Sequence, residues 1–286
     1  MKPKKIGKTL SQYILKIDCS DEKGLIYKIS NVIYKNSLNI EKNSEFVEED
    51  SKKFFFRARV VGTLEKDKIK AELKAVLPKD AKVYMGVRRA KNIVLMATKE
   101  SHCLGDILLK NQSKELNANI QAVISNHNSL KELTQKFDIP YFCVSAENLQ
   151  REEHERKVLT LLKEFNPDFI ILAKYMRILT SDFVKEYEGK IINIHHSFLP
   201  AFIGANPYKQ AYERGVKIIG ATAHFVNNNL DEGPIISQDV ISINHELSWK
   251  DMQKAGRNVE KVVLSNAIDL AFEDRIFVHN NKTIIF

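Results

Sequence analysis

An asparagine and a histidine lie two residues apart within one apolar stretch, Ile191-Ile192-Asn193-Ile194-His195. Side chains two apart along a β-strand share a face, so Asn193 and His195 are predicted to project together while Ile192 and Ile194 face the other way. An amide donor beside an imidazole can stabilise the negative charge that develops on a carbonyl oxygen under attack. Taken alone, these residues are equally well explained as a turn cap with locally hydrogen-bonded histidines.

An acidic residue lies in a second polar stretch further along the chain. Residues 227–232 read Asn-Asn-Asn-Leu-Asp-Glu between two apolar segments, and Asp231 in this loop could face the His195 site. A carboxylate there can orient an attacking water, accept its proton and stabilise a protonated imidazole. An acid in this loop could therefore act together with Asn193 and His195.

A metal centre or a serine nucleophile would be the rival explanation of these residues. A metal site could use His195, His196, His224 and Asp231, but adjacent histidines on a strand point to opposite faces, and the sequence has no His-x-x-x-His pair. Ser197 lacks the surrounding Gly-x-Ser-x-Gly of a nucleophile elbow. We therefore expect neither a metal ion nor a cofactor at this site.

Alternating strands and helices must position these residues, which is typical of a largely parallel, doubly wound α/β sheet. In such sheets ligands bind at the carboxyl ends of the strands, where Asn193 and His195 would emerge. Two later strands, at 220–226 and 234–243, and a long amphipathic helix at 248–273 complete the predicted domain. The five predicted strands before them are 93–98, 120–125, 141–145, 169–173 and 191–195.

The first part of the chain has a different pattern. Strand, helix, strand, helix and strand alternate up to about residue 86, with strands at 13–17 and 53–61 and the second helix at 67–77. Gly24 marks a turn where a strand passes directly into a helix. This pattern resembles an ACT domain, which implies a small α+β domain with the order βαββαβ.

The resemblance to ACT domains implies binding and assembly. In ACT domains the loop after the first strand, with the sheet edge of a partner subunit, commonly forms an amino-acid effector pocket, which here implies Asp21, Lys23, Gly24 and Leu25. A small domain that only dimerises is the alternative. ACT domains usually pair their sheets or helices across subunits, so we predict a homodimer or a homotetramer.

The boundary between two domains is predicted at 83–91, which contains the run Arg88-Arg89-Ala90-Lys91. The length of 286 residues exceeds the roughly 100–200 residues of a typical single domain. We expect residues 1–88 to form the ACT-like regulatory and dimerisation domain. Residues 89–286 should form the Rossmann-like catalytic domain.

The catalytic half resembles the folate-dependent formyltransferase superfamily. The resemblance rests on Asn193-x-His195, on Ser197-Phe198-Leu199-Pro200 and on Leu230-Asp231-Glu232-Gly233-Pro234-Ile235, in the order that the family has them. With its leading ACT-like domain, nearly the whole chain is similar to the deformylase branch. The resemblance implies hydrolysis of 10-formyltetrahydrofolate to formate and tetrahydrofolate, which balances the one-carbon folate pool and supplies formate for purine synthesis.

The same resemblance implies roles for individual residues. Asn193, His195 and Asp231 match the family's catalytic asparagine, histidine and aspartate, and His224 matches a supporting histidine. The effectors implied for the amino-terminal domain are methionine and glycine. The segments that match the surroundings of the bound pterin are Met176, Arg177, Ile178 and Leu179, together with Val226 and Asn227.

Two alternatives differ in what happens to the formyl group. Superfamily members that transfer it to glycinamide ribonucleotide carry a glycine-rich, phosphate-cradling loop after the first strand of this domain. Residues 98–106 contain a single glycine here, Gly105, with a flanking acid, Asp106, and a bulky Leu104, so we expect water as the nucleophile. A non-catalytic amino-acid or folate sensor is the second alternative, against which the intact catalytic set argues.

Composition excludes several broad classes of protein. Lysine and arginine give a formal net charge of +8 but are interleaved with acids, so a folate polyanion is a better expectation than nucleic acid. The three cysteines form neither a disulfide framework nor a Cys-x-x-Cys site, which favours a reducing compartment. The basic start of the chain is followed by no apolar signal core, and no apolar run approaches the ~20 residues of a membrane span. We expect a cytoplasmic protein without a membrane partner.

Overall fold

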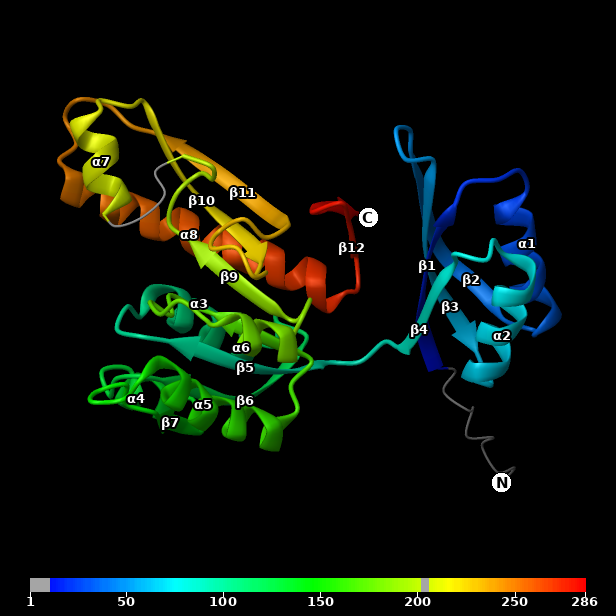
Figure 1. Cartoon of the computed structure of the whole chain (residues 1–286), viewed down its shortest axis with the longest axis horizontal. Helices are drawn as coiled ribbons and strands as arrows, with labels where there is room; N and C mark the ends of the chain where they lie inside the picture. Colours follow the sequence, from blue (N-terminus) through cyan, green and yellow to red (C-terminus); the bar gives the residue numbers. More distant parts are fainter. Residues whose placement is uncertain (1–10, 202–205) are drawn as a thin grey trace, which may run out of the picture. The chain divides into compact units, whose positions relative to one another are not determined.

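The computed structural model describes residues 11–201 and 206–286. These residues form two compact units: the first comprises the described residues up to Arg89 together with Ile285 and Phe286, and the second runs from Ala90 to Ile284 (Figure 1). Within the described residues, no helix is both long enough and apolar enough to cross a membrane.

The first unit is a four-stranded antiparallel sheet with two helices packed on it (Figure 1). The strands are arranged β2-β3-β1-β4, and the chain order is the βαββαβ that the ACT resemblance implies. The elements are β1 Ser11–Ser20, α1 Leu25–Lys35, β2 Asn39–Glu48, β3 Lys53–Gly62, α2 Lys66–Val76 and β4 Lys82–Val87.

The core of the first unit follows the alternation of its central strands. Because the pleat sends every second residue to the same face, Leu15 and Ile17 of β1 join Ile29 of α1 and Ile69 of α2 in one buried cluster. Gly24 has a φ of 90°, a left-handed conformation that glycine adopts without strain. The chain therefore turns directly from β1 into α1, as the sequence predicts.

Two features of the first unit differ from the expectations. The residue pattern did not indicate β2, because this strand lies at the edge of the sheet and none of its residues is fully buried. The segment 83–91 is not a free junction, because β4 extends to Val87 and buries Met85 in the core. The next strand begins at Lys91, so only residues 88–90 lie between the two strands.

The second unit is a seven-stranded sheet in the order β11-β10-β9-β8-β5-β6-β7. Its five strands from β5 to β9 pair in parallel, as predicted, whereas β10 is antiparallel to β9 and β11 is antiparallel to β10. The strands are β5 Lys91–Ala97, β6 Ala118–Ser125, β7 Tyr141–Cys143, β8 Phe169–Leu172, β9 Ile191–His195, β10 Ile218–Phe225 and β11 Ile235–Ser242.

Helices cover both faces of this sheet (Figure 1). Ile107 of α3 and Ile268 of α8 belong to one buried cluster, whereas Val158 of α5 and Phe183 of α6 belong to another on the opposite face. Ser248 caps α8 through a capping box, close to the predicted start of this helix. The helices are α3 His102–Gln112, α4 Lys131–Gln135, α5 Arg151–Phe165, α6 Ser181–Glu186, α7 Pro207–Glu213 and α8 Trp249–Phe272.

A hairpin that the sequence analysis did not predict follows α8. It consists of β12 Ile276–His279 and β13 Lys282–Ile285. Asn280 and Asn281, between the two strands, have φ of 48° and 59°, and two consecutive positive φ angles are typical of the tight turns that join two-stranded hairpins. The Asn-Asn pair is therefore the signal that could have indicated this turn.

Candidate active site

Asn193 and His195 lie on β9, next to the antiparallel strand β10. In the register of the two strands, Asn193 pairs with His224 and His195 pairs with Thr222. Directly opposite residues in a sheet share a face, so His224 joins the face of Asn193 and His195. Ile194, between them on β9, is buried in the core. The predicted alternation along this strand thus gathers polar groups from two strands.

Asp231 reaches His195 from the loop between β10 and β11. Its Oδ1 lies 3.2 Å from Nδ1 of His195, and because an ionised carboxylate only accepts hydrogen bonds, Nδ1 carries the hydrogen. The other ring nitrogen of His195, Nε2, is buried and has no hydrogen-bond partner in residues 11–201 and 206–286. Asp231 therefore orients the imidazole and leaves Nε2 available to a ligand.

Close backbone contacts hold Asp231 in this position. Asp231 has a φ of 58°, in the left-handed region that aspartate tolerates better than most residues. A Cβ added to Gly233 would lie 1.7 Å from the carbonyl oxygen of Phe225, so only glycine allows the loop to return this closely to β10. Asn281 of the terminal hairpin donates to the carbonyl of Glu232 at 2.9 Å. The loop is thus fixed from both sides.

His224 sets the orientation of the Asn193 amide. Nδ1 of His224 lies 2.9 Å from the carbonyl oxygen of Phe225, which can only accept, so Nδ1 carries the hydrogen and Nε2 is an acceptor. Nδ2 of Asn193 lies 3.2 Å from that Nε2 and donates one of its two hydrogens there. The second amide hydrogen remains for a ligand, such as a developing oxyanion.

Burial and mutual contacts set the charges of the site. Burial raises the pKa of the Asp231 carboxyl, but the hydrogen bond from His195 and the charges of the nearby histidines lower this pKa overall. Burial lowers the pKa of His224, and burial together with Lys174 and His195 lowers the pKa of His196 to about 4. At neutral pH, Asp231 is therefore ionised and both His224 and His196 are neutral.

Thr222 anchors the chain that follows His195. Its side chain is fully buried, and Oγ1 donates to the carbonyl of Ser197 at 2.9 Å. The same oxygen accepts from the amide of Leu199 at 3.1 Å and from Nε2 of Gln238 at 2.9 Å. A hydroxyl has one donor and two acceptor positions, so all three are used.

The residues expected around a bound pterin lie partly on one hydrophobic cluster. Leu179 and Val226, far apart in sequence, both pack against the cluster that contains Phe183. Met176 and Ile178 leave more than half of their side-chain surface exposed, at 58% and 55%. The structure thus places Leu179 and Val226 against the same hydrophobic cluster and leaves two apolar side chains open to a ligand.

The remaining residues of these two segments are partly exposed. Arg177 lies between the two exposed apolar side chains, and the carbonyl of Ile178 accepts two hydrogen bonds from the guanidinium of Arg151, at 2.9 and 2.7 Å. Oδ1 of Asn227 accepts from the backbone amide of Asn229 at 3.0 Å. The first segment is therefore held through the backbone carbonyl of Ile178, and the second through the side chain of Asn227.

The residues expected to bind an effector lie in the first unit, at the turn between β1 and α1. Asp21, Lys23 and Gly24 are exposed, and the backbone amide of Asp21 donates to the carbonyl of Lys52 at 2.8 Å. The side chain of Leu25 is buried in the core of this unit. Leu25 can therefore shape such a site only through the backbone.

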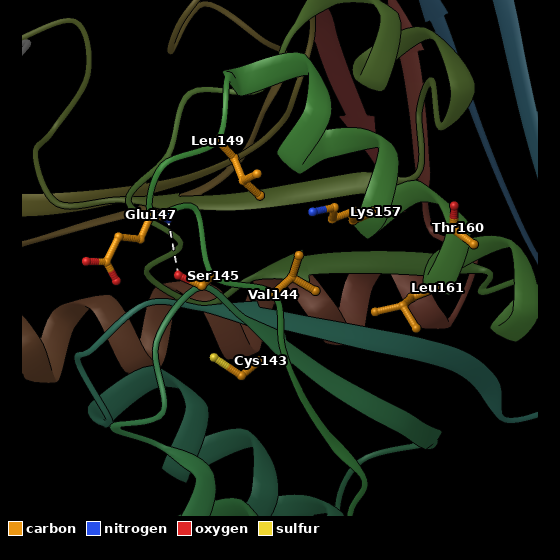
Figure 2. Close-up of a pocket in the computed structure, with 8 residues that line it drawn as sticks. All are labelled: Cys143, Val144, Ser145, Glu147, Leu149, Lys157, Thr160 and Leu161. Carbon is orange, nitrogen blue, oxygen red and sulfur yellow. Dashed lines mark hydrogen bonds between the residues drawn. The ribbon is translucent and has the colours of Figure 1, made fainter.

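A hollow of about 620 Å³ lies between the end of β7 and α5 (Figure 2). Its lining includes Cys143, Ser145, Glu147 and Lys157, and Oγ of Ser145 accepts from the backbone amide of Glu147 at 3.1 Å. Lys157 forms an ion pair of 3.4 Å with Glu153 of the same helix. None of the residues singled out from the sequence lines this hollow.

A buried cluster around Glu260 of α8 was not found from the sequence. Tyr208, His102 and Lys174 converge on its carboxylate. Its only signal in the sequence is an acid on the apolar face of the predicted helix. Among the described residues, His102, Cys103 and Glu260 are also the one group whose atoms lie close enough to share a metal ion, but the ammonium of Lys174, 3.3 Å from Glu260, opposes a cation there.

Comparison with known proteins matches both units of the chain. Residues 13–78 match the ACT domain family and residues 91–268 match the Formyl transferase family. A formyltetrahydrofolate deformylase of Haemophilus influenzae is 52% identical over 276 residues, which is 96% of this chain and 99% of the relative. The crystal structure of a formyltetrahydrofolate deformylase from Pseudomonas syringae pv. tomato has a TM-score of 0.93 and 38% identity, covering 98% of this chain and 96% of that chain.

A transferase shares the fold over a smaller part of the chain. Glycinamide ribonucleotide transformylase 1 from Symbiobacterium toebii has a TM-score of 0.66 and 26% identity, and covers 69% of this chain and 94% of that chain. The deformylases, in contrast, match nearly the whole length. The chain therefore belongs to the Formyl transferase family and, within it, to the formyltetrahydrofolate deformylases.

Proposed function

We propose that this chain hydrolyses 10-formyltetrahydrofolate to formate and tetrahydrofolate. The observation that carries the proposal is the pair of His195 and Asp231, whose Nδ1 and Oδ1 atoms are 3.2 Å apart. This pair orients an imidazole on the same face of the sheet as the donor amide of Asn193. The similarity to formyltetrahydrofolate deformylases along both units supports the choice of substrate.

Charge stabilisation is the first task of the site. Water attacks the formyl carbon, a new C–O bond forms, and the carbonyl oxygen becomes an oxyanion. The free amide hydrogen of Asn193 and the Nε2 hydrogen of a protonated His195 donate to this oxygen, and each such donor contributes about 3–4 kcal/mol in a preorganised site. Both groups are held by partners on β10 and its loop, so they need little rearrangement.

Proton movement is the second task. Asp231 orients the attacking water and accepts one of its protons. Collapse of the tetrahedral intermediate breaks the C–N bond, and the departing nitrogen takes a proton from His195. Asp231 then releases its proton to solvent, Nε2 of His195 takes one up from solvent, and the formic acid product ionises to formate. Amide, imidazole and carboxylate supply every step, so the proposed reaction uses neither a metal ion nor a cofactor.

The first turn of the catalytic unit supports water rather than a phosphate-bearing acceptor as the nucleophile. α3 begins at His102, just after β5, where doubly wound sheets often hold a phosphate. Glu100 lies in this turn, 3.3 Å from Arg257, and His102 bonds to the buried Glu260 at 2.8 Å. These two carboxylates engage the nearby cations Arg257 and Lys174, which are then not available to bind a phosphate group.

Regulation by an amino acid and assembly through the first unit form the second part of the proposal. The match to the ACT domain family supports an effector site at Asp21, Lys23, Gly24 and Leu25, with methionine and glycine as candidate effectors, and a homodimer or homotetramer. All three cysteines are unpaired, which supports a reducing, cytoplasmic environment. Light scattering that shows a monomer, or no response of turnover to either amino acid, would contradict these assignments.

Formate release without an added acceptor tests the proposed function. Purified protein is incubated with 10-formyltetrahydrofolate alone, and formate is measured against time. We expect turnover under these conditions and the same rate when glycinamide ribonucleotide is added. Turnover that depends on the added amine would indicate a transferase, and binding of the folate without any turnover would indicate a sensor.

A further inference from the structure

One buried carboxylate joins four segments beside the catalytic strand. Glu260 lies in the middle of α8 and is 1% exposed. Its Oε1 accepts from the hydroxyl of Tyr208 at 2.6 Å, and its Oε2 lies 2.8 Å from Nε2 of His102 and 3.3 Å from Nζ of Lys174. Lys174 follows β8, His102 begins α3 and Tyr208 lies in α7, so the cluster links the carboxyl edge of the sheet to two helices beyond it.

The construction of the cluster sets it apart from an exposed ion pair. Lys174 is buried, at 3% exposed, and has a φ of 65°, in the left-handed region that is uncommon for a non-glycine residue. A Cβ added to Gly256 would lie 2.2 Å from the hydroxyl oxygen of Tyr208, so only glycine lets the tyrosine lie against α8. Burial raises the pKa of Glu260, but His102, Lys174 and Tyr208 lower it to about 2. The carboxylate is therefore ionised and fully engaged.

His196 connects this cluster to the catalytic centre. Its ring centroid is 5.2 Å from that of His195 and 6.2 Å from that of Tyr208. His196 and Tyr208 also line one cavity of about 110 Å³. The charged groups that act on His196 are Lys174 and His195, which oppose its protonation, and Glu260 and Asp231, which favour it. A change in the charge of Lys174 or Glu260 therefore alters the electrostatic environment of His196, the residue next to His195.

Resting on the proposed function, we infer that Glu260 is a positioning residue for the hydrolysis. Glu260 binds Lys174, His102 and Tyr208 in one charge-balanced cluster. This cluster holds His196 in position and thereby positions the preceding residue, His195. Without Glu260, the ammonium of Lys174 is left uncompensated and disfavours a second positive charge on His195. Without Lys174, the carboxylate of Glu260 has the opposite effect. Removal of both charges restores the balance.

Four forms of the full-length chain test this inference: the unmodified protein, Glu260→Gln, Lys174→Met and the double variant. The readout is kcat for formate release as a function of pH. Glu260→Gln should move the alkaline limb of the kcat profile about one unit toward lower pH, and Lys174→Met should move it about as far toward higher pH. The double variant should return to within roughly 0.3 unit of the unmodified protein. Glu213→Gln, which removes the same charge from an exposed pair with Lys209, should leave the profile in place.

The titration of His196, followed by nuclear magnetic resonance without substrate, is a second readout that does not depend on turnover. The pH at which His196 is half-protonated, near 4 in the unmodified protein, should be lower in Glu260→Gln and higher in Lys174→Met. A purely structural defect would not depend on whether a negative or a positive charge was removed. Shifts of the kcat profile in the same direction for both single variants would therefore overturn the inference. An unchanged His196 titration in both variants would overturn it as well. Absence of formate release from the unmodified chain would instead overturn the proposed function.

Discussion

The amide of Asn193 and the imidazole of His224 lie opposite each other on β9 and β10 and share a hydrogen bond of 3.2 Å. The backbone carbonyl of Phe225 fixes the hydrogen on Nδ1 of His224, so Nε2 must accept and Asn193 must donate. A residue proposed to contact the oxyanion is thus oriented by the neighbouring strand. His224 therefore acts on the reaction through Asn193.

Replacement of His224 by leucine should lower kcat without removing substrate binding. Leucine offers no acceptor, so the Asn193 amide loses its orientation, and a misplaced oxyanion donor costs about 10- to 100-fold in kcat. We expect KM to stay within about threefold, because the oxyanion contact forms mainly in the transition state. The measurement is steady-state formate release. His224→Gln, which keeps an acceptor, should recover part of kcat, and a leucine variant with normal kcat would contradict the assignment.

Replacement of Thr222 by valine should destabilise the catalytic unit. Valine has a similar shape, but it removes the oxygen that bonds the Ser197 carbonyl, the Leu199 amide and the Gln238 side chain. Buried groups left without partners cost about 1–3 kcal/mol in the free energy of unfolding. Urea denaturation followed by the fluorescence of Trp249, the single tryptophan, measures this loss. Equal midpoints for the two proteins would show that these bonds do not stabilise the segment after His195.

Replacement of Gly233 by alanine should displace Asp231. The new Cβ would lie 1.7 Å from the carbonyl oxygen of Phe225, a distance at which the loop or β10 must move. We expect the kcat for formate release to fall about 100-fold or more, because the carboxylate loses its place beside His195. Gly105→Ala is the matched control, since a Cβ there meets no atom within 4 Å and alanine favours the helix. Full activity of the Gly233 variant would contradict the role given to this loop.

Acid should destabilise the fold through His196 between about pH 6.5 and about pH 4. The pKa of this group is lowered from 6.5 to about 4 in the folded chain, so across this window the unfolded chain binds a proton that the folded chain does not. The contribution of His196 to the free energy of unfolding is therefore fully present above this window. It decreases as the pH falls, by up to about 3 kcal/mol. His196→Gln should show a smaller decrease in urea denaturation midpoint between these pH values. The same pH dependence in both proteins would contradict the burial of a neutral His196.

The sequence alone predicted the strands of the catalytic unit and their largely parallel pairing, because buried parallel strands appear as continuous apolar runs. It did not predict the order of these strands or the antiparallel pairing of β10 and β11. The stretch that contains Ile191 and Ile192 is one such run, and strand alternation correctly separates Ile194 from its polar neighbours. The edge strand β2 has no such pattern, since none of its side chains is fully buried. The βαββαβ order of elements along the first unit came from family resemblance rather than from periodicity.

The geometry of the site depends on contacts that no local pattern encodes. The pairing of Asn193 with His224 requires the antiparallel register of β10, and a slip of one residue would turn His224 to the other face. The position of Asp231 requires Gly233 against β10 and Asn281 from the terminal hairpin. An acid at position 260 on an apolar helix face indicates a buried partner, but it does not indicate which residues supply that partner.

Formate release by Asp231→Asn, compared with the unmodified protein at saturating 10-formyltetrahydrofolate, tests the central claim most directly. Asparagine has nearly the same shape but can neither stabilise a protonated His195 nor accept a proton from water. We predict that kcat falls about a thousandfold or more, while the affinity for a folate analogue, measured by calorimetry, changes by less than about threefold. A kcat within about threefold of the unmodified protein would contradict the proposed hydrolysis by Asn193, His195 and Asp231.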